Sequence, residues 1–282
     1  MKKLVIATTQ MRHPTLDKGE KRFDSPKPLL DDALSYIKQA LAFNADLICL
    51  PEVFANFNRS QPIELTAESM AGEIMDFLQY QAKKHAIGII GTVYLKKTGN
   101  IINAGVAFNK KGVLVGMYPK VHAGPGEKIK SGRAFPVFEI EGVRAGIQIC
   151  YDLNFPEGCR CLALQGADLV FWPNLWGDMP ELYTDVIMRA RAMENQMFLV
   201  SSAMFLEGEP FFKAPKVYGR SCIISWEGTV LAEVGRRTGI AIAQLDFDEP
   251  RFSQAKRRKM LFAHRKPEAY AVLVKKARPR IK

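Results

Sequence analysis

The amino-acid sequence predicts a single domain with a mixed α/β fold, and three observations lead to this expectation. Short apolar runs typical of buried β-strands alternate with segments of helical spacing along most of the chain. At 282 residues, with 48% hydrophobic side chains, the chain can bury a large core. It has no uncharged apolar stretch of roughly 18 residues, so we expect no membrane span. We therefore expect one α/β domain over residues 1–282, with a basic C-terminal extension from about residue 250.

The first half of the chain begins with a strand at residues 4–9, followed by a polar loop that contains prolines. Apolar side chains at i, i+3, i+4 and i+7 then predict a helix over residues 29–44. Residues 46–50 are nearly all apolar, as expected of a parallel strand covered on both faces, and they lead directly to Pro51-Glu52. The next expected elements are a helix at residues 69–85 and strands at residues 87–94, 103–109 and 113–118.

In the second half, a loop over residues 119–133 contains Lys120 and Glu127. A later apolar strand ends at Cys150, and Pro156-Glu157 begins a helix, since proline and an acidic residue are typical of the first helical turn. Cys150 should therefore lie on the sharp turn between a buried strand and a helix. The other expected elements are strands at residues 137–140, 143–149, 167–172, 197–204, 221–226, 230–234 and 240–245 and a helix at residues 180–196.

Three reactive side chains, Glu52, Lys120 and Cys150, each follow the carboxyl end of a predicted strand. Because binding crevices of open α/β sheets gather at that edge, we expect the three to meet. A thiol on such a turn is suited to act as a nucleophile, and the backbone N–H of Tyr151 can then point at a developing oxyanion. Taken alone, each residue has a simpler interpretation, as a packing cysteine, a turn acid and a surface lysine.

Five segments in this order resemble the signature of the nitrilase superfamily of carbon–nitrogen hydrolases. They are Leu50-Pro51-Glu52, Tyr118-Pro119-Lys120-Val121-His122, Cys150-Tyr151-Asp152-x-x-Phe155-Pro156-Glu157, Arg191-Ala192-Met193-Glu194-Asn195-Gln196-Met197-Phe198 and Gly219-Arg220-Ser221-Cys222-Ile223. The resemblance implies a four-layer α-β-β-α sandwich, a homodimer or larger homo-oligomer, and no cofactor. It also implies that Cys150 is the nucleophile, Glu52 the general base, Lys120 the cation beside the oxyanion, and Glu127 a positioning glutamate.

The chemistry of these residues fits cleavage of an amide. A thiol with a pKa of about 8.5 is mostly protonated at neutral pH, so Glu52 can take its proton as the sulfur attacks and return it to the departing amine. Lys120 and the Tyr151 N–H would hold the tetrahedral oxygen. Tyr-Asp after the cysteine resembles the amidase-like branch of the family. We predict hydrolysis of a non-peptide C–N bond in a small linear amide to a carboxylate and ammonia or amine, through a Cys150 thioester.

Two alternatives stay open. The enzyme alternative is a nitrilase or an N-carbamoyl-amide hydrolase, the latter releasing carbon dioxide together with ammonia. The alternative from another class is a catalytically silent binding protein that holds an anionic partner with its basic tail, because the net charge is +11 and cations gather at residues 256–259 and 275–282. Neither run has interleaved aromatic side chains and no nucleic-acid motif is present, so we expect a solvated surface and no nucleic-acid partner.

Further side chains at the strand ends are candidates for substrate binding. They are Phe54, Phe57, Asn154, Trp172, Asn174, Trp176 and Met204. Five cysteines, an odd number, argue against a disulfide framework and for a reducing cytosol, so we expect a cytoplasmic protein. The cysteine and histidine spacings suggest no metal site.

Two neighbours of the predicted catalytic residues have non-catalytic interpretations. His122 could form a dyad with the cysteine, but the family pattern places the base at a glutamate, so we favour a loop-shaping role. Asp152 and Glu157 are interpreted as acids at a helix start, favoured by the helix dipole, with Arg160 as their ion-pair partner.

Overall fold

The computed structural model describes residues 2–12, 25–55, 63–175, 181–205, 219–248 and 256–275. Two of the candidate substrate-binding residues, Phe57 and Trp176, lie outside these described residues.

The first sheet has the strand order β5-β4-β3-β2-β1-β12, with the N-terminal strand β1 beside the edge strand β12. Its core is parallel from β1 to β3, whereas β4, β5 and β12 pair antiparallel with their neighbours. The strands of this sheet are β1 (Lys3–Arg12), β2 (Leu47–Cys49), β3 (Gly88–Lys97), β4 (Asn100–Phe108), β5 (Leu114–Pro119) and β12 (Gly239–Asp246).

The second sheet has the order β6-β7-β8-β9-β10-β11 and is parallel from β7 to β9. It joins the first sheet where the end of β1 pairs with the end of β9, with Gln10 opposite Ala203. The strands of this sheet are β6 (Val137–Ile140), β7 (Val143–Ile147), β8 (Leu169–Pro173), β9 (Phe198–Phe205), β10 (Cys222–Ile224) and β11 (Val230–Glu233).

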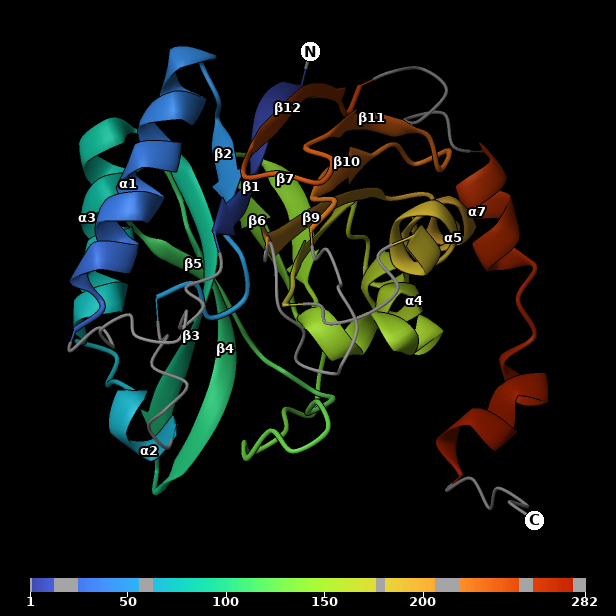
Figure 1. Ribbon diagram of the computed structural model, residues 1–282. Coiled ribbons are helices and arrows are strands. Elements are labelled where there is room, and N and C mark those ends of the chain that lie inside the picture. The colour runs from blue at the N-terminus through green and yellow to red at the C-terminus, as the bar shows by residue number, and fades with distance from the viewer. Residues whose placement is uncertain are drawn as a thin grey trace.

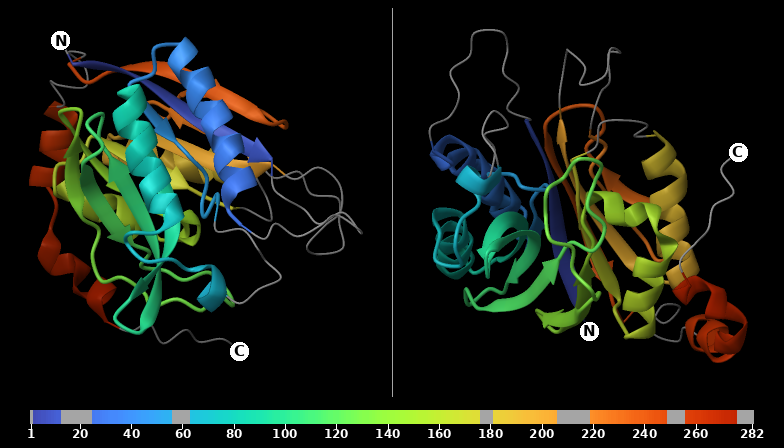
Figure 2. Two further views of the ribbon diagram at one scale, coloured as in Figure 1. Left: turned by 90° about the vertical axis from the view of Figure 1, so that its left-hand side faces the viewer. Right: turned by 90° about the horizontal axis from the view of Figure 1, so that it is seen from below.

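Helices cover the outer face of each sheet, so that the layers run helix, sheet, sheet, helix (Figures 1 and 2). The first sheet is covered by α1 (Lys27–Ala42) and α3 (Glu73–His85). The second is covered by α4 (Pro156–Leu164) and by α5 (Arg189–Asn195), which continues the π-helical segment η2 (Leu182–Met188). The remaining short helices are α2 (Ile63–Thr66), the 3₁₀ segments η1 (Cys150–Asn154) and η3 (Pro267–Val274), and α7 (Lys256–Ala263).

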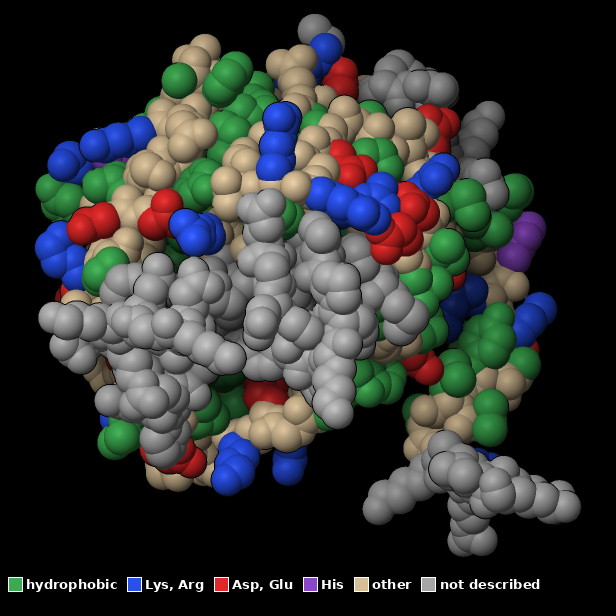
Figure 3. Space-filling view, in the orientation of Figure 1, with side chains coloured by type: hydrophobic (Ala, Val, Ile, Leu, Met, Phe, Trp, Pro, Cys, Tyr) green, Lys and Arg blue, Asp and Glu red, His purple; other side chains and the backbone are tan. Residues whose placement is uncertain are grey.

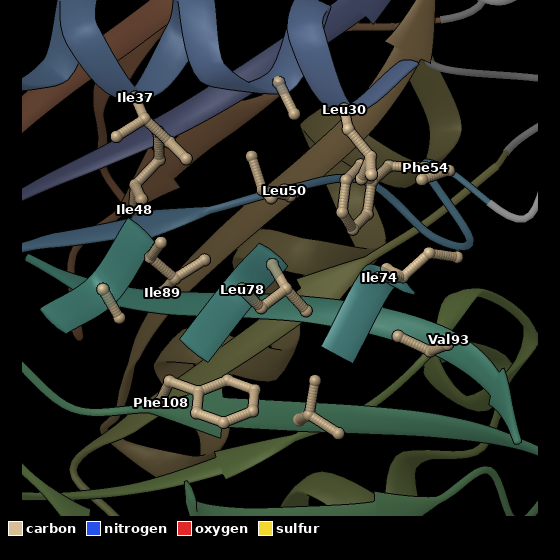
Figure 4. Packing of buried hydrophobic residues seen from close by; sticks show 14 of the residues in the cluster. Leu30, Ile37, Ile48, Leu50, Phe54, Ile74, Leu78, Ile89, Val93 and Phe108 are labelled. Atoms are coloured by element: carbon tan, nitrogen blue, oxygen red, sulfur yellow. The ribbon is translucent and has the colours of Figure 1, made fainter. Parts of the chain in front are cut away.

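Three hydrophobic clusters separate the four layers. The first, between α1, α3 and the first sheet, includes Ile37 and Ile48 (Figure 4). The second lies between the two sheets and includes Leu47 and Ile147, and the third packs Leu162 of α4 against the second sheet. Neighbouring residues of β2 thus enter different clusters, because side chains alternate across a strand. The apolar run at residues 46–50 is therefore a strand buried on both faces, as predicted.

The two sheets approach closely where the first sheet has glycine. A Cβ at Gly105 of β4 would lie 2.7 Å from Cγ2 of Ile147 on β7. A Cβ at Gly116 of β5 would lie 2.5 Å from Phe138 on β6. Real Cβ atoms do not approach so closely, so these two positions accept no side chain unless the facing residue moves.

The expected α/β fold and its order of elements are confirmed, with shifts at some boundaries. The helix predicted from residue 69 begins at Glu73, because the Glu68 carboxylate accepts hydrogen bonds from the backbone N–H groups of Ile74 (3.0 Å) and Met75 (2.9 Å). These N–H groups belong to the first helical turn and have no partner inside the helix, so an acceptor placed before them fixes where the helix starts.

The sequence analysis did not predict the C-terminal helices α7 and η3. Its interpretation of residues 256–259 as a solvated run is wrong for Arg258, which anchors α7 to the second sheet's side of the molecule. The Arg258 guanidinium lies 2.6 Å from the Asp168 carboxylate and donates hydrogen bonds to the carbonyls of Ala167 (2.6 Å) and Ala163 (3.0 Å). A cation at the C-terminal end of α4 is also favoured by that helix's dipole.

Candidate active site

Cys150 lies where β7 leads into the 3₁₀ segment η1, and its backbone is in the left-handed region, at φ 46°. A non-glycine residue in this region is strained, and such strain is held only where the surroundings fix it. Trp172 of β8 supplies one such constraint, since its indole Nε1–H donates to the Cys150 carbonyl at 2.9 Å. Cys150 therefore lies on the sharp turn that the sequence predicted.

Glu52 follows the end of β2 and is 4% exposed. The next residue, Val53, has φ 43°, which is unusual for a β-branched residue, and its backbone N–H donates to the Thr92 hydroxyl. The backbone turns sharply at this point, and the Glu52 carboxylate and the Cys150 thiol are close enough for each to influence the pKa of the other.

Lys120 follows β5 and is 2% exposed, with its ammonium between two carboxylates. Its Nζ lies 2.8 Å from Glu52 Oε1 and 2.8 Å from Glu127 Oε2. Glu127 Oε2 also accepts the backbone N–H of Gly124 at 2.8 Å, which ties the loop after Lys120 to the cluster. All four residues predicted to be catalytic are thus brought together from distant parts of the chain.

The surroundings of the cluster shift the pKa values of Glu52, Lys120 and Cys150. Burial raises the pKa of Glu52, and the neighbouring Glu127 adds to this while Lys120 opposes it. Burial lowers the pKa of Lys120, but the charges of Glu52, Cys150 and Glu127 outweigh this and hold its pKa above the ordinary value. Burial and the Glu52 carboxylate raise the pKa of Cys150 well above that of a free thiol. These shifts favour a protonated thiol at Cys150 and a charged ammonium at Lys120.

Asp152 links the Lys120 loop to the turn that carries Cys150. It is fully buried, and its Oδ1 accepts the backbone N–H of His122 at 2.9 Å and lies 2.8 Å from His122 Nδ1. Its Oδ2 accepts the Ile149 N–H at 2.9 Å and the Tyr118 hydroxyl at 2.7 Å. The His122 ring stacks on Phe155 with centroids 3.8 Å apart. This geometry agrees with a loop-shaping role for His122.

We expected an ion pair between Arg160 and the acids at the start of the helix. Among the described residues, Asp152 forms no ion pair with Arg160. Arg160 Nη2 instead donates to the Glu194 carbonyl at 2.8 Å, and its guanidinium lies over the Phe262 ring at 5.2 Å. Asp152 takes backbone and hydroxyl donors because it is buried below the turn, out of reach of the exposed face of α4.

Two polar residues of the cluster were missed by the sequence analysis, Asn103 of β4 and Tyr94 of β3, which stand opposite each other in the sheet. Asn103 Nδ2 donates to Glu52 Oε1 at 2.9 Å and to Glu127 Oε1 at 2.9 Å. The Tyr94 hydroxyl donates to Glu127 Oε1 at 3.4 Å. The available signal was a carboxamide inside the apolar run at residues 101–108.

The candidate substrate-binding residues have protein contacts of their own, and their contact with substrate stays a prediction. Phe54 and Met204 are buried in the cluster beneath α1 and α3. Asn174 is buried and donates to Ser201 Oγ at 3.1 Å. Asn154 accepts the Tyr183 hydroxyl at 2.7 Å and donates to the Tyr151 carbonyl at 3.1 Å. Trp172 donates to the Cys150 carbonyl, as described above.

Among the described residues, no group of three or more His, Cys, Asp or Glu side chains is arranged to hold a metal ion. No helix in the same residues is both long and apolar enough to span a bilayer.

Comparison with known proteins gives consistent matches. Residues 5–252 match the family described as carbon-nitrogen hydrolase. Deaminated glutathione amidase of Homo sapiens is 28% identical over 258 residues, covering 84% of this chain and 77% of the relative. The 2-oxoglutaramate amidase of Bacillus subtilis (strain 168) is 31% identical over 212 residues, covering 73% of this chain and 80% of the relative.

Solved structures share the fold. The crystal structure of a carbon-nitrogen hydrolase from Helicobacter pylori G27 superposes with a TM-score of 0.82 at 20% identity, covering 97% of this chain and 99% of that one. An amidase from Nesterenkonia sp. AN1, solved in complex with acrylamide, gives a TM-score of 0.74 at 22% identity, covering 92% and 96%. The four-layer sandwich is therefore the fold of this chain.

Proposed function

Because the chain belongs to the carbon–nitrogen hydrolase family, we propose that Cys150, Glu52, Lys120 and Glu127 form its catalytic site. The chain is an amidohydrolase that cleaves C–N bonds other than peptide bonds, as its amidase relatives do. The observation that carries the assignment of residues is the cluster in which the buried Lys120 ammonium lies 2.8 Å from each of two carboxylates, one of which, Glu52, is close enough to raise the pKa of the Cys150 thiol.

Acylation begins when the Cys150 sulfur attacks the amide carbon and the thiol proton passes to Glu52. The raised pKa of Glu52 makes it a stronger base for this transfer. The negative charge that develops on the amide oxygen is stabilised by the Lys120 ammonium and by the backbone N–H of Tyr151, the second residue of η1. Lys120 keeps its proton throughout, because the charges of the neighbouring acidic groups hold its pKa above the ordinary value.

The tetrahedral intermediate then breaks its C–N bond, and Glu52 returns the proton to the departing nitrogen as ammonia or amine leaves. The acyl group stays on sulfur as a thioester. Glu52 next takes a proton from a water molecule, whose oxygen attacks the thioester carbon, and gives that proton back to the sulfur as the carboxylic acid is released. Glu127 holds Lys120 and the loop through Gly124 during both half-reactions.

The proposed substrate is a small linear amide. The printed names of two relatives specify deaminated glutathione and 2-oxoglutaramate, so these two amides head the test panel, with a nitrile and an N-carbamoyl compound beside them. We expect ammonia from an amide and a mass increase of one acyl group on Cys150 during turnover. The Cys150→Ala variant should lose both, whereas Cys161→Ala, a cysteine on the exposed face of α4, should keep both. Ammonia release by Cys150→Ala at the wild-type rate would refute the mechanism.

We also propose a homodimer or larger homo-oligomer in which residues 1–282 act as one unit and the C-terminal extension takes part in assembly. Large apolar side chains are exposed on η3, and Val274 reaches 89%. Further exposed apolar side chains, Leu182, Val186 and Met193, recur at helical spacing along η2 and α5. Figure 3 shows hydrophobic side chains on the surface of the C-terminal extension, which contains α7 and η3. Light scattering on the eluted protein tests this, and a monomer at micromolar concentration would contradict it.

A cytoplasmic location is proposed because all five cysteines are unpaired, and three of them, Cys49, Cys159 and Cys222, are buried packing residues. Lysine and arginine side chains are spread among acidic ones on the face shown in Figure 3, which supports a solvated surface and no nucleic-acid partner. Fractionation of cells that express the tagged protein tests the location.

A further inference from the structure

We infer that Asn103 is a positioning residue for the general base: its carboxamide holds the Glu52 and Glu127 carboxylates on either side of Lys120. The inference rests on the proposed function, because it gives Asn103 a role that acts through Glu52. None of the hydrogen bonds of Asn103 in the described residues goes to the reacting sulfur.

The four side chains form a closed ring of hydrogen bonds. Lys120 Nζ is 2.8 Å from Glu52 Oε1 and 2.8 Å from Glu127 Oε2, and Asn103 Nδ2 is 2.9 Å from Glu52 Oε1 and 2.9 Å from Glu127 Oε1. Two donors therefore bridge the same pair of carboxylates from two sides. Glu127 is also held by the Gly124 N–H and the Tyr94 hydroxyl, whereas for Glu52 the Asn103 amide adds a second hydrogen bond to the one from Lys120.

The chemistry of the site fixes which way the Asn103 amide faces. A carboxamide offers two N–H donors at nitrogen and only acceptors at oxygen, so only the nitrogen can face two carboxylates. The opposite side of the amide supports this assignment: Oδ1 is buried and has no hydrogen-bond partner among the described residues. A buried acceptor without a partner costs free energy, and such sites are informative because most buried polar atoms are satisfied. The Asn103 side chain therefore donates to both carboxylates, while its own acceptor, Oδ1, stays without a partner among the described residues.

The backbone of Asn103 also serves the cluster. Its carbonyl accepts the backbone N–H of Lys120 at 2.8 Å, so one residue holds the main chain at the cation and the side chains of both acids. Asn103 is on β4, which is paired with β3 on one side and β5 on the other, and its cross-strand neighbour Tyr94 donates to Glu127 at 3.4 Å. A strand in a sheet is a rigid support compared with the turns that carry Glu52 and Cys150.

A neutral hydrogen-bond donor such as the Asn103 amide is suited to the position between the Glu52 and Glu127 carboxylates. Burial and, after it, repulsion from the Glu127 carboxylate raise the pKa of Glu52, and hydrogen bonds to the ionised form counteract this rise. An ammonium ion in place of the amide would add a second buried cation, and a carboxylate would add a third anion. Loss of the amide donors should therefore raise the pKa of Glu52 further and loosen its orientation toward the Cys150 thiol.

The test compares Asn103→Leu, Asn103→Ser and Asn103→Asp with Asn100→Leu as the matched control. Asn100 begins the same strand, is exposed, and donates only to the Thr98 carbonyl among the described contacts. We expect kcat of Asn103→Leu to fall about ten- to a hundredfold, the range for losing a hydrogen bond to a charged group, with KM changed less than about threefold. The acid limb of its pH–rate profile should move to higher pH. Asn103→Ser, which keeps one donor, should fall between Asn103→Leu and the wild type.

A second readout does not depend on any substrate. The rate at which iodoacetamide alkylates Cys150, followed by intact mass as a function of pH, reports whether Glu52 still accepts the thiol proton. We expect the pH dependence of Asn103→Leu to shift upward as in turnover, and that of Asn100→Leu to match the wild type. Asn103→Asp should show the largest loss at neutral pH and recover in part on acidification, because a protonated carboxyl regains one donor.

Melting curves separate positioning from a purely structural role. The inference is overturned if the folded variants of Asn103 melt at lower temperature but keep the wild-type kcat, pH–rate profile and alkylation profile. If Asn103→Leu does not fold, the same comparison is made with Asn103→Asp, which keeps the shape of the side chain, and with Asn103→Ser, which is smaller and polar. Altered alkylation without turnover of any amide would keep the role of Asn103 and reject the proposed function, so the two failures are distinguishable.

Discussion

Replacing Lys120 by methionine tests the core of the site most directly. The substitution keeps most of the side-chain volume and removes the ammonium, which leaves Glu52 and Glu127 buried without their shared cation. Breaking a buried ion pair by removing one partner costs about 3–5 kcal/mol, because an uncompensated charge remains inside the protein. We expect the free energy of unfolding at neutral pH to drop by about that amount.

The loss should depend on pH with a defined sign. In the wild type, Lys120 has a raised pKa and stays charged over the whole range of about pH 5 to 8. In Lys120→Met, the pKa of Glu52, already raised by burial, rises further because the cation that opposed this is absent. A group whose folded pKa is raised stabilises the fold below its unfolded pKa and loses that contribution as pH increases. The deficit of the variant should therefore be small near pH 5 and largest near pH 8.

Urea denaturation followed by the fluorescence of the three tryptophans measures these free energies. The control is Lys97→Met, an exposed lysine at the end of β3. Loss of one oxyanion donor should in addition lower kcat by about a hundred- to a thousandfold. A variant as stable as the wild type at about pH 8, or one that keeps more than about a tenth of the rate, would refute the assignment of Lys120 as a charged, shared partner.

Two other predictions follow from the geometry. The value of kcat/KM should fall on the acid side at a pH above the ordinary glutamate value of 4.5, because only ionised Glu52 accepts the thiol proton and burial raises its pKa. A profile that is flat down to that pH would contradict the assignment of Glu52 as the base. Gly105→Ala should lower the free energy of unfolding by about 1–3 kcal/mol, since the new Cβ would lie 2.7 Å from Ile147. An unchanged urea midpoint for Gly105→Ala would show that the sheets can separate without cost.

The part of the fold that depends on local pattern was predictable from the sequence. The strand at residues 46–50 was recognised because its alternating sides are both apolar, and the turn at Cys150 because a strand pattern stops just before a proline start signal. The helix start at Glu73 was missed because the Glu68 side chain, five residues upstream, decides it. Helix α7 was missed because its charged residues at 256–259 give little amphipathic signal.

The candidate site was predictable for residues whose signal lies beside them in the sequence. Glu52, Lys120 and Cys150 each follow a strand within a recognisable motif. Asn103 has no such motif, because its function depends on being opposite Tyr94 and beneath the loop of Glu127, which are pairings set by the folded sheet. The role of Asp152 was likewise predicted from the helix that follows it in the sequence. In the fold, Asp152 is buried and binds the backbone N–H of His122, in the loop after β5.

The site draws its parts from both sheets. Glu52, Lys120 and Asn103 stand on the first sheet, and Cys150 stands at the end of β7 on the second. Lys120 and Asn103 are hydrogen-bonded to the Glu52 carboxylate, so the distance from that carboxylate to the Cys150 sulfur depends on how the two sheets pack against each other. We therefore expect a displacement of about 1 Å between the sheets to lower the rate of hydrolysis by about a hundredfold, even where every strand stays intact.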